Sequence, residues 1–200
     1  MRLVYRIILF SGLLLSITSC ATTSQKVSYY IIQPDNGLEP LALPLDSLSI
    51  AIGPAEFPTY LRRNQIVTRD NNRLSVNEYH RWGASFEKTV LSAVGENIRQ
   101  LLNTTHVIVY PTLPRFALNY RLVMDIVQFD GKLGDEVTLN VRWMVLDKTG
   151  KIPLIVKQSK LTQHAEGTSY DDLVAVYGRL LASLSKEMAD SVNSAMRQDT

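Results

Sequence analysis

Few side chains in this sequence have the types and spacing that catalysis or metal binding requires. Asp171 and Asp172 form an acidic pair, but they open a predicted helix, where carboxylates stabilise the positive end of the dipole. Gly131 and Gly134 lie between predicted strands, and no lysine and hydroxyl residue follow them as in a phosphate-binding loop. The histidines lack the H-E-x-x-H spacing of a zinc site: His80, His106 and His164. We therefore expect no enzyme, no catalytic residue, no metal and no cofactor.

Cys20 is the one residue whose surroundings indicate a chemical modification. It follows Arg2, Arg6, the apolar run Ile7–Leu15 and a few small residues, which is the anatomy of a secretory signal. Ile17-Thr18-Ser19-Cys20 resembles a bacterial lipobox. That resemblance implies removal of residues 1–19 and covalent attachment of a diacylglycerol and an N-acyl lipid to Cys20. The alternative is an ordinary cleaved signal, or a membrane anchor, that ends in a cysteine by chance.

Charge and cysteine content limit what the exported chain can do. The full sequence has 21 basic and 19 acidic residues. Arg2 and Arg6 are lost with the signal, so the mature chain is formally neutral, which argues against a nucleic-acid partner. Because Cys20 is the single cysteine, the domain has no internal disulfide and its stability must come from packing.

The domain organisation is simple. Residues 20–26 are a short polar tether, and residues 27–200 have the length of a single domain. Six tether residues reach at most ~20 Å, and a domain of this size is only ~40 Å across. The folded part must therefore stay close to its membrane, and it would need a partner to connect two membranes.

Hydrophobic periodicity predicts mainly strands, several of them short. A predicted three-stranded antiparallel meander, residues 118–127, 136–145 and 152–162, is the clearest pattern, because alternating apolar residues are separated by short turns. Gly53-Pro54 is expected to end the second strand. The other predicted strands are Val27–Ile32, Ser47–Ile52, Gln65–Arg69 and His106–Tyr110.

Two amphipathic helices complete the predicted fold. Ser75-Val76-Asn77-Glu78 has the spacing of a capping box, so we expect the first helix to begin there and to end near Leu102. The second should begin near Ser169 and continue to the end of the chain. The sequence thus predicts an α+β fold in which a mostly antiparallel sheet of six or seven strands carries both helices on one face.

The segment Pro58–Arg69, together with Trp82, is the strongest candidate for an interaction surface. It places aromatic side chains beside arginines, a combination that is enriched at protein interfaces. The alternative is a loop that enters a strand, with the aromatic residues packed and the arginines paired with Glu78 and Asp70. The candidate interface residues are Pro58, Tyr60, Leu61, Arg63, Arg69 and Trp82, of which Trp82 is expected to pack beneath the others.

Four features of the sequence resemble the PqiC/YmbA-like family of ABC-type transport auxiliary lipoproteins, which are associated with MCE-domain proteins. They are the lipobox with Cys20, the opening strand Tyr29-Tyr30-Ile31, the pattern P-x-Y-L-x-R-x-x-I-V-x-R from Pro58 to Arg69, and E-x-x-R-W from Glu78 to Trp82. The similarity covers essentially the whole mature chain.

The resemblance implies an outer-membrane lipoprotein on the periplasmic face, which docks an MCE-domain tunnel protein of an intermembrane lipid transport system. Some members of the family are expected to form homo-oligomeric rings. Ala21, in place of aspartate after the lipidated cysteine, favours the outer membrane. Two alternatives remain open at this point: a periplasmic carrier that binds lipid directly, and a lipoprotein that activates outer-membrane assembly or a cell-wall synthase.

Overall fold

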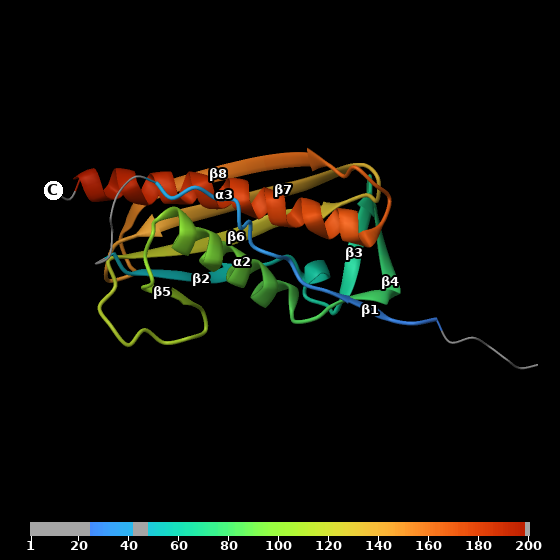
Figure 1. Cartoon of the computed structure of the whole chain (residues 1–200), viewed down its shortest axis with the longest axis horizontal. Coiled ribbons are helices and arrows are strands. Elements are labelled where there is room, and N and C mark those ends of the chain that lie inside the picture. Colours follow the sequence, from blue (N-terminus) through green and yellow to red (C-terminus); the bar gives the residue numbers. More distant parts are fainter. Residues whose placement is uncertain (1–24, 42–47, 199–200) are drawn as a thin grey trace, which may run out of the picture.

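The computed structural model describes residues 25–41 and 48–198, so Cys20, the signal and most of the tether lie outside the described residues. The described part is an α+β fold, as predicted, with two sheets and two long helices (Figure 1). The three-stranded sheet, in the order β1-β4-β3, contains β1 (Ser28–Tyr30), β4 (Arg73–Trp82) and β3 (Gln65–Asp70). The five-stranded sheet, in the order β5-β2-β6-β7-β8, contains β5 (Val107–Val109), β2 (Ile50–Glu56), β6 (Tyr120–Gly131), β7 (Glu136–Leu146) and β8 (Pro153–His164). The helices are α2 (Phe86–Leu101) and α3 (Tyr170–Gln198), and a short 3-10 turn, η2 (Thr59–Leu61), precedes β3.

The predicted single, mostly antiparallel sheet is a partial error. Three of the strand pairings are parallel: β1 with β4, β2 with β5, and β2 with β6. Parallel neighbours need long crossover connections, and here the chain passes through β3, β4 and α2 between β2 and β5. The alternation of apolar residues in a strand reports which face is buried, but it carries no information about the direction of its neighbour.

The predicted meander is confirmed. β6 pairs antiparallel with β7, and β7 pairs antiparallel with β8. Gly134 and Gly150, in the two connecting turns, both have φ of 69°, a conformation that glycine adopts without strain. β8 is an edge strand, so the meander forms the outer side of the five-stranded sheet.

The predicted start of the first helix is wrong. Ser75–Glu78 lies in β4, where Ser75 pairs with Thr68 and Val76 with Val67 of β3. The β3–β4 hairpin therefore overrides the local capping-box pattern. Helix α2 begins only at Phe86, after Ser85, whose hydroxyl accepts a hydrogen bond from the Lys88 amide at 3.3 Å.

The Gly53-Pro54 pair does not end the second strand, contrary to the prediction. β2 runs from Ile50 to Glu56, and its pairing with β6 shifts register between Ile52 and Ala55. A proline is tolerated in a strand at such an irregularity, because no regular ladder hydrogen bond is required of it there.

Both helices pack on one face of the five-stranded sheet, as predicted, and α3 runs along the meander (Figure 1). Phe129 of β6 lies at the centre of the buried aromatic cluster, with ring centroids 4.6 Å from Tyr177 of α3 and 5.7 Å from Phe86 of α2. Neither of the described helices has the length and apolar character needed to cross a bilayer.

Replacing Phe129 by alanine should lower the free energy of unfolding by about 3–5 kcal/mol, because a fully buried aromatic ring is lost and a cavity remains. Urea unfolding followed by circular dichroism measures this difference. Val127→Ala is the matched control, since Val127 is 40% exposed on the same strand and its loss should change stability by no more than about 0.5 kcal/mol. Equal effects of the two substitutions would contradict the assigned core.

Candidate interaction surface

Asp130, near the end of β6, organises the region that contains the predicted interface residues. Its carboxylate is fully buried and accepts three hydrogen bonds. Tyr60 Oη donates at 2.5 Å, Arg69 Nε at 2.8 Å and Gln128 Nε2 at 2.9 Å. Arg69 also supplies the compensating positive charge. A buried carboxylate requires such partners, because burial disfavours its charged form.

This cluster connects the two sheets. Tyr60 belongs to η2 and Arg69 to β3 of the three-stranded sheet, whereas Asp130 belongs to β6 of the five-stranded sheet. The guanidinium carbon of Arg69 also lies 5.2 Å from the centroid of the Tyr60 ring. The segment Thr59–Asp70 is therefore held against β6 by the Tyr60–Asp130 hydrogen bond and the hydrogen-bonded Arg69–Asp130 ion pair, while the cation–π contact joins Tyr60 and Arg69 within the segment.

The electrostatic environment keeps Tyr60 neutral and Arg69 charged. Burial, reinforced by the hydrogen bond to Asp130, raises the pKa of Tyr60 to about 12, so its hydroxyl remains a donor at neutral pH. The same carboxylate raises the pKa of Arg69 and stabilises its charge. Burial also raises the pKa of Tyr177, which packs against Phe129 next to the cluster.

The structure separates the predicted interface residues into two groups. Tyr60 and Arg69 are half-buried on Asp130, while Leu61 and Trp82 are buried. The Trp82 ring is tilted against that of Phe86, with 4.9 Å between the ring centroids. These four side chains contact the protein's own core. The expected pairing of an arginine with Glu78 is found for Arg81, at 3.2 Å, but Arg69 pairs with Asp130 rather than with Asp70.

Arg63 and Pro58 are the predicted residues that reach solvent, Arg63 fully and Pro58 partly. Arg63 lines a surface groove of about 370 Å³ between η2, β2 and the start of α2. Its neighbour Arg62 forms an ion pair with Glu56 at 2.6 Å. Arg63, by contrast, makes no ion pair with any residue that the structure describes, so its charge is available to a ligand or partner.

Sequence analysis missed Asp130 and Gln128, the residues that organise this region. Asp130 looked like the first residue of a polar turn, because aspartate, glycine and lysine follow one another there. Strand β6 instead continues to Gly131. A register shift between Ile126 and Gln128 places Phe129 opposite the buried Leu139 and Asp130 opposite Thr138, and Asp130 is buried there against its partners in η2 and β3. Nothing local to the sequence indicates that Arg69 lies beside it.

The described residues contain no candidate metal site. Within residues 25–41 and 48–198, no group of histidine, cysteine, aspartate and glutamate side chains is arranged to hold a metal ion. His80 stacks on Tyr170 with ring centroids 3.9 Å apart and hydrogen bonds to the Tyr30 hydroxyl at 2.7 Å, which is a packing role.

Replacing Asp130 by asparagine should lower the free energy of unfolding by about 3 kcal/mol, because Arg69 loses its counter-charge in a poorly solvated position. Urea unfolding at pH 7 measures this loss. Asp125→Asn is the matched control: Asp125 pairs with Arg142 at 2.6 Å, but both side chains are exposed, so the expected cost is about 0–1 kcal/mol. Equal costs for the two variants would show that Asp130 does not have this role.

Solved structures resemble this fold at low sequence identity. A crystal structure of an uncharacterized protein has a TM-score of 0.67 and 18% identity, and the match covers 84% of this chain and 99% of that one. Protein XCC0632 from Xanthomonas campestris has a TM-score of 0.65 and 12% identity, with 86% and 98% of the two chains covered. At this identity the likeness shows a shared fold alone.

Family membership follows from the sequence itself. No curated protein matches the chain. The model of the family described as ABC-type transport auxiliary lipoprotein component matches residues 30–189, which is most of the sequence and nearly all of the described fold. This match confirms the resemblance inferred from the motifs. The chain belongs to the family of ABC-type transport auxiliary lipoprotein components.

Proposed function

We propose that this lipoprotein is anchored through an acylated Cys20 to the periplasmic face of the outer membrane, where it docks an MCE-domain tunnel protein of an intermembrane lipid transport system. The observation that carries the docking proposal is the unpaired, exposed Arg63 in a groove on a rigidly held loop. Family membership supports the transport context. The protein acts as a structural component in this scheme, with no catalytic step of its own.

The position of the chain's start supports a fixed orientation at the membrane. The described chain begins at residue 25, five residues after Cys20, so at most ~18 Å separates that residue from the proposed anchor. β1 and the three-stranded sheet lie at one end of the long axis, and the end of α3 lies at the other (Figure 1). The three-stranded sheet would therefore face the leaflet. Two or three acyl chains make such an anchor stable.

The groove around Arg63 has the features of a docking surface. Tyr110, 47% exposed, lines the same groove and adds aromatic area beside the cation. The buried Leu61 side chain and the Tyr60–Asp130 hydrogen bond hold η2 in place directly before Arg63. Because the backbone before Arg63 is held by these contacts, less of the loop has to be ordered on binding, and the planar guanidinium is suited to a carboxylate of the partner.

Reversing the charge at Arg63 should weaken partner binding. We expect Arg63→Glu to reduce co-purification of the MCE-domain protein at least about tenfold, because an attractive contact becomes a repulsive one. Arg115→Glu is the matched control, since Arg115 is exposed in the loop before β6 and makes no described ion pair. Retention of the partner by Arg63→Glu at the wild-type level would exclude this groove as the docking site.

Removing the proposed lipid site should detach a folded protein from the membrane. We expect Cys20→Ala to move the protein into the soluble fraction after osmotic shock, with the same circular dichroism spectrum as the wild type. Ser24→Ala, in the same tether, should leave the protein in the membrane fraction. If Cys20→Ala stayed membrane-bound after high-salt and carbonate washes, anchoring through this cysteine would be disproved.

A further inference from the structure

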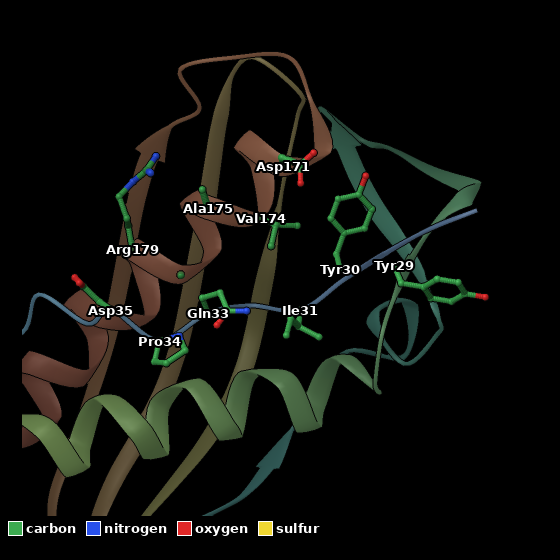
Figure 2. A pocket seen from close by; sticks show the side chains of 11 residues that line it. Tyr29, Tyr30, Ile31, Gln33, Pro34, Asp35, Asp171, Val174, Ala175 and Arg179 are labelled. Carbon is green, nitrogen blue, oxygen red and sulfur yellow. The ribbon is translucent and has the colours of Figure 1, made fainter. Parts of the chain in front are cut away.

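A second groove, of about 580 Å³, lies between the segment that follows β1 and the first half of α3 (Figure 2). The side chains that decide its character are Tyr29, Ile31, Asp35, Asp171, Val174 and Arg179. Gly178 allows the two walls to approach closely, because a Cβ at this position would lie 3.0 Å from the Gln33 carbonyl oxygen. The groove is thus bounded on one side by extended chain and on the other by a helix.

Part of the groove is apolar and exposed. Tyr29 is 67% and Ile31 53% exposed, both within a few residues of the first described residue. Val174 and Ala175 form the facing helical wall, and Ala175 is exposed in it. Exposed apolar side chains that line one groove favour an apolar ligand or surface there.

Arg179 is the second unusual feature. Its Nε is buried and has no hydrogen-bond partner, and its guanidinium makes no ion pair with the described residues. The Arg179 side chain as a whole is partly exposed and lines the groove, so its guanidinium is an uncompensated cation there. Such a cation favours a ligand that carries an anionic group. Figure 2 shows Arg179 and Asp171 on the same helix, on either side of Ala175.

The total charge of the groove restricts which ligand with an anionic group could bind beside Arg179. Asp35 and Asp171 contribute two carboxylates against the single cation of Arg179, so the lining is net negative. The Asp171 side chain makes no described hydrogen bond or ion pair. A ligand with a net negative charge would be repelled, whereas a zwitterion with one phosphate and one ammonium group would match both signs.

We propose that this groove binds a zwitterionic phospholipid of the phosphatidylethanolamine type from the anchoring leaflet. Arg179 holds the phosphate, the carboxylates of Asp35 and Asp171 attract the ammonium group, and hydrocarbon lies along Ile31 and Val174. The leaflet is the source because the groove begins at Tyr29, nine residues from Cys20 along the chain. The proposal rests on the proposed anchoring, and it extends the function from docking to direct contact with lipid.

Photolabelling of the full-length protein in mild detergent tests this site. The probes are phosphatidylethanolamine and phosphatidylglycerol, each with a diazirine in one acyl chain, and labelled peptides are mapped by mass spectrometry. We expect the ethanolamine lipid to label residues 29–35 or 171–179, and unlabelled ethanolamine lipid to compete. Phosphatidylglycerol and inorganic phosphate at the same concentration should not compete. Labelling in detergent needs neither the partner protein nor the membrane, so its failure is distinguishable from failure of the docking proposal.

Two variants and two matched controls connect the labelling to the groove. Arg179→Gln should reduce labelling about tenfold, through loss of a charge-assisted hydrogen bond, and Ala175→Trp should abolish it by filling the groove. Ser183→Trp, exposed on α3 two turns further along, and Arg115→Gln should label like the wild type. Circular dichroism confirms that each variant is folded. Labelling outside the groove, competition by inorganic phosphate, equal labelling by phosphatidylglycerol, or wild-type labelling of both groove variants would overturn the proposal.

Discussion

The burial of one carboxylate, Asp130, is the constraint on which the arrangement of the two sheets depends. A charge with no solvent access must find a counter-charge and hydrogen-bond donors. Here Gln128 of the same strand supplies one donor, but the counter-charge and the other donor come from outside the sheet of Asp130. Arg69 and Tyr60 meet this requirement only if β3 and η2 lie against the end of β6. The contacts of Asp130 therefore fix where β3 and η2 lie against β6, in addition to any stability that they contribute.

The position of β3 and η2 determines which side chains the protein exposes to solvent. With Tyr60 and Leu61 turned inward, Arg63 is left outward on a loop that cannot easily move. Elsewhere on the fold, α3 covers the meander, and the segment after β1 passes close to α3 at Gly178, beside the groove that Arg179 lines. The two candidate binding surfaces thus follow from how the three-stranded sheet and α3 are held on the five-stranded sheet.

Sequence patterns predicted the structure correctly where an element depends mainly on its own residues. The meander and α3 were predicted nearly to their ends, because an alternating strand or an amphipathic helix can be recognised from the residues of that segment and its turns alone. They failed at Ser75–Glu78, whose local pattern favours a helix start but whose pairing with β3 makes a strand. They also failed at Gly53-Pro54, where β2 continues between two parallel neighbours across an irregular register.

By itself, the sequence determined the family and the α+β class, and it contains no recognisable catalytic motif. These follow from residue type and spacing over short stretches. Only the tertiary structure decided that Arg69 pairs with Asp130, 61 positions away, and that Arg179 and Asp35 line the same groove. The physical reason is the same in both cases: the free energy of a buried charge or an unsatisfied donor depends on neighbours that folding brings together from distant parts of the chain.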